Sequence, residues 1–304
     1  MKSTTVRRVT LSIALTTALA GVAACGSSGG SGSSGKDDKA VHKGTTHVSP
    51  IAALRSVDKS TDNADSVKFD STTTLGTMTS VKIDGALQWA DGHNTGNATI
   101  TYTGGTSAEM MRQLGSTSIQ ARYLPDAYYA KMGDKFAEQA GGKHWIKYAY
   151  DDLAKLGGGS GAFLKDQMQN TTPNQSVKLL LASGDVKKVG EDRVRGEQTT
   201  HYSGTVNVAD LATKTSNLSA SQLADLKKQL TAAGVTTEKV DIWVNGDNLL
   251  VKKVEKGELS SGTMSSTAYY SDYGVKVSAT EPPASDTADF KDLLKAQSTG
   301  GTTS

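Results

Sequence analysis

Apolar and polar residues alternate along most of the chain, which is the pattern of strands in a sheet with one face in water. The alternation runs through residues 67–75, 81–89, 98–102 and 119–123, and again through 193–208, 240–244, 250–254 and 264–270. Turn residues separate the runs, among them Asp91-Gly92, Gly104-Gly105 and Asn245-Gly246. Short turns between such runs favour antiparallel pairing. Asp272-Tyr273-Gly274 predicts a further turn into a strand through Val275 and Val277.

A few stretches carry helical spacing instead. Ser49-Pro50 predicts a helix start ahead of Ile51. Ser219 and Gln222 form a capping box that predicts a helix ending at Gly234. Further helices are expected at 163–168, 177–181 and 290–294. The pattern gives about ten strands and four or five short helices, with no linker after Ser49 long enough to divide domains. We therefore expect one α+β domain, a single large antiparallel sheet that curls, with helices on one face.

The first 24 residues have the pattern of a secretory signal peptide. Lys2, Arg7 and Arg8 precede an apolar stretch of 12 residues, Val9–Ala20, which is too short to span a bilayer. Arg7-Arg8 leaves the twin-arginine export route open, although the residues that follow favour the general route. The segment ends in Val22-Ala23-Ala24-Cys25, which resembles the bacterial lipobox. That resemblance implies that a diacylglyceryl group modifies Cys25 and that Cys25 becomes the mature N-terminus.

A polar tether follows Cys25. Ten of the 14 residues in Gly26–Lys39 are Gly or Ser, a composition typical of flexible linkers. We expect residues 25–48 to form the lipidated Cys and its tether, 49–296 the folded domain, and 297–304 a disordered tail. The expected location is the outer face of the cytoplasmic membrane, where the lipid on Cys25 provides the membrane contact.

Charge and cysteine content exclude several function classes. The chain has 33 Lys and Arg against 31 Asp and Glu, and removing the three basic residues of the signal peptide leaves 30 against 31. This balance argues against nucleic-acid binding, which depends on neutralising phosphates. A single Cys excludes a disulfide framework and a Cys-based zinc site.

No catalytic or metal-binding motif fits its sequence context. The five His residues do not stand at ligand spacing, so no metal is expected. Gly157–Ala162 matches only the loosest dinucleotide fingerprint, and the segment before it is not a buried strand. Ser160 lacks the second Gly of a nucleophile elbow. The sequence therefore predicts no enzyme activity and no cofactor.

Short motifs along the mature chain resemble those of the actinobacterial LppX/LprG lipoproteins, which have a LolA-like fold. The motifs are Ser66–Asp70, Tyr128–Met132, Lys143–Lys147, Gly196–Tyr202, Gly204–Val208, Val240–Val244, Tyr270–Gly274, Val275, Val277 and Pro282-Pro283. The resemblance implies a half-barrel of antiparallel strands with helices in its mouth and a cavity for acylated lipids. It also implies that such lipids are carried or presented at the membrane.

Strand parity and helix stripes predict which side chains would line such a cavity. The residues are Leu87, Trp89, Ile100, Tyr102, Ile119, Tyr123, Phe163, Met168, Leu180, Ile242 and Tyr270. The alternative is that these side chains fill the interior themselves. The protein would then be a non-catalytic interaction or structural lipoprotein of the cell envelope. Sequence alone leaves both open.

Overall fold

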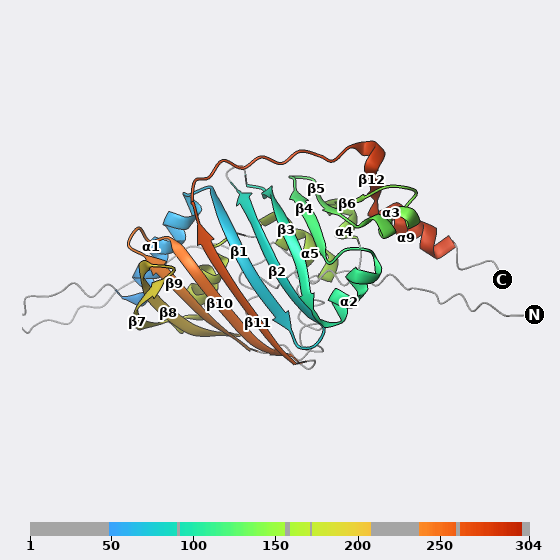
Figure 1. Ribbon diagram of the computed structural model, residues 1–304. Coiled ribbons are helices and arrows are strands. Elements are labelled where there is room, and N and C mark those ends of the chain that lie inside the picture. Colours follow the sequence, from blue (N-terminus) through green and yellow to red (C-terminus); the bar gives the residue numbers. More distant parts are fainter. Residues whose placement is uncertain are drawn as a thin grey trace, which may run out of the picture.

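The computed structural model describes residues 49–89, 92–155, 159–170, 172–207, 237–259 and 262–299. The predictions about Cys25, the tether and the capping-box helix from Ser219 to Gly234 lie outside these residues. Within them, the chain forms one sheet with helices gathered on one side (Figure 1).

Twelve strands of the described residues form this sheet, in the order β12-β6-β5-β4-β3-β2-β1-β11-β10-β9-β8-β7. The strands are β1 (Ser66–Leu75), β2 (Thr79–Gln88), β3 (Thr95–Gly104), β4 (Ser118–Tyr123), β5 (Ala127–Lys131), β6 (Trp145–Ala149), β7 (Lys187–Val194), β8 (Glu197–Asn207), β9 (Thr237–Asn245), β10 (Leu250–Leu259), β11 (Gly262–Ser271) and β12 (Thr287–Asp289). Neighbouring strands are antiparallel except β12, which pairs parallel with β6. The expected α+β fold with one open, curved sheet is confirmed.

The helices cover mainly the two ends of the sheet. They are α1 (Pro50–Asp62), α2 (Gly105–Gln113), α3 (Asp134–Gln139), α4 (Tyr150–Leu153), α5 (Gly159–Asn170), α6 (Gln175–Ser183) and α9 (Phe290–Thr299). Helix α6 packs on β8 and β9, and α1 packs on α6. At the other end α4 and α9 contact β6, and α5 contacts α4. Figure 1 shows α4 and α5 behind the sheet.

Local sequence accounts for the helix start at α1. Ser49 takes the N-cap position, and its side chain accepts a hydrogen bond from the backbone N–H of Ala52. Pro50 begins the helix, as expected, and Leu54 and Val57 point inward and are fully buried. The capping residue and the spacing of the apolar positions were both readable from the sequence.

Two sequence-based predictions are wrong. Gly104-Gly105 is not a simple turn, because α2 begins at Gly105 with φ +78°. A Cβ there would lie 2.6 Å from the carbonyl oxygen of Met78, so only glycine fits. Val275 and Val277 do not belong to a strand.

Residues 275–283 instead form a strap that crosses the ends of the strands, visible along the top of Figure 1. Side chains of the strands hold its carbonyl groups. The Ser66 hydroxyl donates to Val275 O, the Asn97 amide to Ser278 O and the Arg122 guanidinium to Thr280 O. Because an extended segment alternates its side chains whether or not it pairs, the alternation alone misidentified the strap as a strand. The strap leads to β12, which the sequence did not predict.

Candidate functional site

The strand residues predicted for the cavity all lie on the face of the sheet that carries the helices, which we call the inner face. The register pairs Ile100 with Ile119, and Tyr270 with Phe69. Following these pairs across the sheet puts the predicted strand residues on this one face: Leu87, Ile100, Tyr102, Ile119, Tyr123, Ile242 and Tyr270. That they line a ligand cavity stays a prediction.

Two apolar clusters lie on the inner face, one toward each end. The α5 cluster contains Ile119, Ala121, Ile146, Tyr148 and Met168 among its buried residues. The α6 cluster contains Leu54, Val177, Leu180, Val240 and Ile242. The helices seal both clusters, since the exposed fractions of Ile146, Leu180 and Ile242 are all 0%.

The remaining predicted residues have separate surroundings. Met168 of α5 is buried in the α5 cluster, and Leu180 of α6 in the α6 cluster. Trp89 follows β2 and donates its indole N–H to the carbonyl oxygen of Asp62 at the end of α1. This contact joins the end of α1 to the end of β2. The side chain of Phe163 lies outside the described residues.

Between the clusters, the inner face of the central strands is less covered. We call this region the trough. Its residues are apolar or aromatic and only partly buried: Phe69, Ile83, Leu87, Ile100, Tyr102, Tyr123 and Tyr270. Phe69 packs against the α5 cluster and Tyr270 against the α6 cluster, so the two clusters meet at this paired position. A row of small residues crosses the same face, where Gly85 pairs with Ala98 and Ala98 with Ala121.

Two trough tyrosines lie deep in the protein and still have accessible surface. Desolvation by the surrounding protein, with a smaller effect of Tyr102, raises the pKa of Tyr123 to about 12. Desolvation also raises the pKa of Tyr270, although the charge of Lys253 opposes the shift. Yet neither side chain is fully buried. Both side chains are therefore largely desolvated while part of their surface remains accessible.

A small apolar cavity adjoins the α5 cluster at the C-terminal helix. It measures about 140 Å³ and lies between Tyr148, Leu153, Phe290 and Leu294. The rings of Tyr148 and Phe290 are 4.7 Å apart, so α9 is held against β6 by aromatic contact. This volume is below the roughly 300 Å³ of an ordinary ligand pocket. By itself it does not hold a long acyl chain.

A buried charged group, which we call the inner charge cluster, lies on β9 and β10 beside the α6 cluster. It consists of Glu238, Lys253 and Glu255, whose exposed fractions are 7%, 6% and 1%. The Lys253 ammonium donates to both carboxylate oxygens of Glu255, at 3.0 and 2.9 Å. Ser176 of α6 donates to Glu255 Oε1 at 2.5 Å. This group interrupts an otherwise apolar inner face.

A polar row continues from the inner charge cluster toward β1. Glu255 pairs in register with Ser266, and Ser266 with Thr73. The hydroxyls of Ser266 and Thr73 are 3.0 Å apart and form a buried hydrogen bond. The inner face is thus apolar at the Phe69–Tyr270 pair and polar four residues further along the same two strands.

Sequence reasoning missed the inner charge cluster. The signal was present, because Glu238 shares the parity of Val240 and Ile242. The Asn245-Gly246 turn then fixes the register that brings Lys253 opposite Ile242 and Glu255 opposite Val240. A search for catalytic spacing within single elements could not find three residues that only cross-strand pairing brings together.

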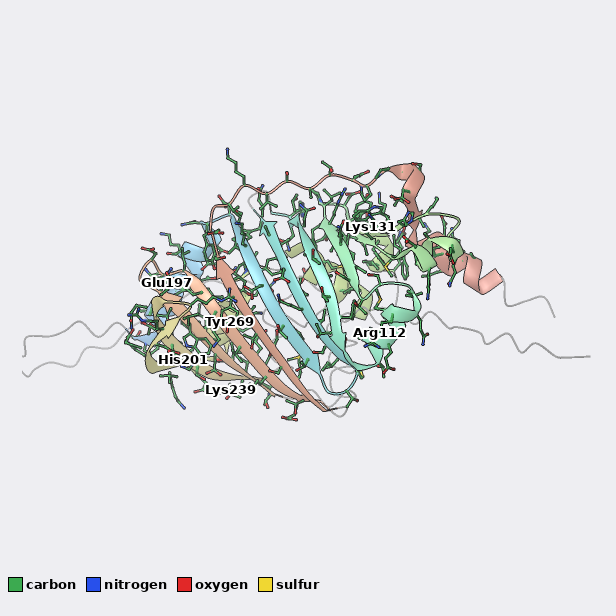
Figure 2. All side chains as sticks on the ribbon, viewed as in Figure 1. Arg112, Lys131, Glu197, His201, Lys239 and Tyr269 are labelled. Atoms are coloured by element: carbon green, nitrogen blue, oxygen red, sulfur yellow. The ribbon has the colours of Figure 1, made fainter. Side chains whose placement is uncertain are left out.

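The outer face carries its charges differently. The ring of His201 stacks on Trp243 with centroids 4.2 Å apart, and its Nε2 lies 2.9 Å from Asp241 Oδ1. The Lys252 ammonium lies 4.0 Å from the centroid of Trp243 and 5.7 Å from that of Tyr269. Figure 2 labels His201 on β8 and Tyr269 on β11, with β9 and β10 between these two strands. We call this group the outer ladder.

The outer ladder ends at the turn between β7 and β8. The Arg195 guanidinium lies 3.8 Å from the centroid of Tyr269 and pairs with both carboxylate oxygens of Asp70, at 2.6 and 2.8 Å. Among the described residues, no group of three or more His, Cys, Asp or Glu could hold a metal ion. Within the same residues, none of the helices combines the length and the apolar character that crossing a bilayer requires.

Comparison with known proteins places the chain among bacterial relatives. No family model matches the chain. The solved structures of LprF from Mycobacterium bovis and of the lipoprotein LppX from Mycobacterium tuberculosis are similar at TM-scores of 0.47 and 0.46, each with 15% identity. They cover 77% and 76% of this chain, and the matches include 96% and 97% of those chains.

Two relatives are much more similar in sequence. The "Uncharacterized 31.2 kDa protein in rplA-rplJ intergenic region" of Streptomyces griseus is 58% identical over 81% of this chain and 81% of its own length. The "Putative lipoprotein SCO4650" of Streptomyces coelicolor is 49% identical over 98% of this chain and 99% of its own length. The chain belongs to the family of these two Streptomyces proteins, one of which is named as a lipoprotein.

Proposed function

We propose that this protein is a lipid-anchored lipoprotein on the outer face of the cytoplasmic membrane that binds an acylated lipid in the trough. It carries or presents that lipid at the cell envelope and is not an enzyme. The observation that carries the proposal is the trough itself, where large apolar side chains between the two clusters are only partly buried. Burying an acyl chain of sixteen carbons there would contribute about 12 kcal/mol before ordering costs.

The membrane anchor is proposed at Cys25. The lipobox-like sequence Val22–Cys25 and the Gly- and Ser-rich residues after it support the assignment, as does the name of the Streptomyces coelicolor relative. Two acyl chains on one cysteine give stable attachment, whereas a single chain gives only marginal binding.

The anchor is tested by metabolic labelling with radioactive palmitate in a Streptomyces host. The wild-type chain incorporates label, and the full chain carrying Cys25→Ser incorporates none. A matched control, Ser27→Ala in the tether, keeps the label. Label that persists in the Cys25→Ser chain would show that acylation takes place elsewhere or that the lipobox assignment is wrong.

Ligand binding is tested on the full chain carrying Cys25→Ser, so that no covalent acyl group contributes to the signal. After purification, extraction with organic solvent and mass spectrometry are expected to detect bound acyl lipid. A fluorescent fatty acid should bind and be displaced by that lipid. A clean extract together with no binding of the fluorescent probe would support the alternative of a filled interior.

Adjacent residues on β3 provide a matched pair for locating the ligand. Ile100 lies in the trough, whereas Thr99 is exposed on the outer face. Ile100→Glu should weaken binding of the fluorescent fatty acid at least tenfold, because a carboxylate would be desolvated by the acyl chain. Thr99→Glu should leave binding unchanged. Ile100→Trp, which fills the trough without adding charge, provides a second test if Ile100→Glu does not fold. Equal binding by all these variants would place the ligand elsewhere.

A further inference from the structure

The inner charge cluster has unused hydrogen-bonding capacity. An ammonium has three N–H donors, and the contacts of Lys253 within the described residues, both to Glu255, occupy two of them. Oε1 of Glu238 is buried and has no hydrogen-bond partner in the described part of the chain. A buried carboxyl oxygen without a partner costs free energy, so it marks a place where a polar group of a ligand would be stabilised.

Glu238 is also open on the side facing β10. Its cross-strand neighbour is Gly257, which carries no side chain. A Cβ at Gly257 would meet only ordinary contacts, the nearest being Thr237 O at 3.5 Å and Met264 Cε at 3.6 Å. On its other side Glu238 pairs with Val206 of β8, and the charged groups that act on its carboxyl are Glu255 and Lys253.

The charges of the cluster limit what could bind there. Two carboxyl groups surround one ammonium, so an anionic headgroup would be repelled by Glu255 and a cationic one by Lys253. A purely apolar group would leave the third N–H of Lys253 and Oε1 of Glu238 without a hydrogen-bond partner. A hydroxyl group both donates and accepts a hydrogen bond, and it carries no charge.

We propose that Glu238, Lys253 and Glu255 form a subsite for an uncharged hydroxyl group on the headgroup of the bound lipid. The proposal rests on the function proposed above and adds to it which lipids are preferred. The acyl chains would lie in the trough beside Tyr270, whose neighbour along the inner face is the inner charge cluster. The hydroxyl would donate to Glu238 and accept from the third N–H of Lys253.

The ionisation of the cluster supports an uncharged ligand. Desolvation, together with the charge of Glu255, raises the pKa of Glu238 to about 8. Desolvation alone would lower the pKa of Lys253, but the charge and hydrogen bonds of Glu255, together with Tyr270 and Glu238, outweigh it and raise that pKa above its usual value. Near neutral pH the cluster therefore holds one ion pair and one protonated carboxyl group, and its net charge is zero.

The test compares three soluble probes on the full chain carrying Cys25→Ser, by titration calorimetry at pH 7. The probes are dioctanoylglycerol, the dioctanoyl ester of propylene glycol, which lacks the hydroxyl, and dioctanoyl phosphatidic acid. We expect dioctanoylglycerol to bind about tenfold more tightly than the ester without the hydroxyl, equivalent to about 1.4 kcal/mol. Phosphatidic acid should bind more weakly than dioctanoylglycerol.

Substitution then locates the effect. Glu238→Met removes the acceptor and a buried carboxyl oxygen that has no hydrogen-bond partner, so it should fold, and it should abolish the tenfold preference for the hydroxyl. The ester without the hydroxyl should bind this variant as it binds the parent chain. Glu258→Met, at an exposed position of β10, is the matched control and should keep the preference. If Glu238→Met is unstable, Glu238→Gln keeps an acceptor oxygen and should keep the preference.

The outcomes separate the two proposals. Equal binding of all three probes would overturn the subsite and leave the lipid-binding function standing. A preference for the hydroxyl that survives Glu238→Met would also overturn the subsite. Tightest binding of phosphatidic acid would show that the cluster selects an anion and contradict the proposal. Failure of all three probes to bind would overturn the lipid-binding function and the subsite with it.

Discussion

Two neighbouring lysines on β10 have opposite surroundings. Lys252 points outward, where its ammonium lies over the rings of Trp243 and Tyr269 and water remains close. Lys253 points inward, where only 6% of its surface is exposed and the carboxylate of Glu255 holds it. The strand repeat of two residues alone decides which lysine is buried.

The difference shows how the two faces use charge. On the outer face, Lys252 and Arg195 meet aromatic rings, and Arg195 also meets a partly exposed carboxylate; such contacts stabilise weakly because water competes. On the inner face, burial makes every unpaired polar atom costly, so the cluster stabilises the fold only while its ion pair is intact. Because a buried ion pair adds little net stability, ligand selection is the use that we propose for it.

The strongest way to test this comparison is to replace each lysine by Met. Lys253→Met would leave Glu255 buried without its cation and should lower the free energy of unfolding by about 3–5 kcal/mol. Lys252→Met should lower it by less than about 1 kcal/mol, since the methionine still covers Trp243. Urea unfolding followed by tryptophan fluorescence measures both. Similar losses for the two variants would show that the faces do not differ as described.

A second test uses pH. The folded protein holds the Glu238 proton up to about pH 8, whereas the usual pKa of this group is 4.5. Between these values the folded state binds more protons at Glu238 than the unfolded state, so the contribution of Glu238 to stability is greatest at low pH and is lost as the pH rises toward 8. The loss due to Glu238 should be on the order of 2–4 kcal/mol.

The contribution of Glu238 is isolated by difference. Urea unfolding of Glu238→Gln at pH 5 and pH 8 should show a smaller fall in stability than the parent chain, because the amide does not titrate. Glu258→Gln on the outer face should behave like the parent chain. If the free energy of unfolding changes between pH 5 and pH 8 by the same amount in the parent chain and in Glu238→Gln, the pKa of Glu238 is not raised.

The smallest expected effect lies on the outer ladder. The Asp70–Arg195 pair is bidentate but partly exposed, with exposed side-chain fractions of 33% and 53%. Asp70→Asn should lower the free energy of unfolding by less than about 1 kcal/mol, and high salt should reduce the difference further. A loss comparable with that of Lys253→Met, or one that salt does not change, would mean that the outer ladder is as important to the fold as the inner charge cluster.

Strand alternation predicted most of the sheet because one face is wet and the other is covered. The runs around Val67, Val81, Ile100 and Ile119 all became strands with the expected parity. The pattern failed for elements that are too short to show a period of apolar residues. Short helices such as α3 and α4 are too brief for a helical period to be read, and β12 has only three residues.

The trough was predicted only in part, for a physical reason. Parity tells which face a residue such as Tyr123 or Ile242 occupies, but the position of the covering helices decides whether that residue is sealed or accessible. Ile242 is sealed beneath α6, whereas Tyr123 retains accessible surface. The inner charge cluster depends on the register of β9 with β10, which no single segment encodes.

The pairing of β1 with β11 has a consequence for when the protein can fold. Lys68 lies opposite Ser271, so the middle of the sheet joins the beginning of the domain to a segment near its end. Contacts between such distant segments form slowly, because a long loop must close first. Until Gly262–Ser271 has been synthesised, β1 lacks one neighbour and the two sheet halves stay separate. The sheet can therefore close only after most of the domain has been synthesised.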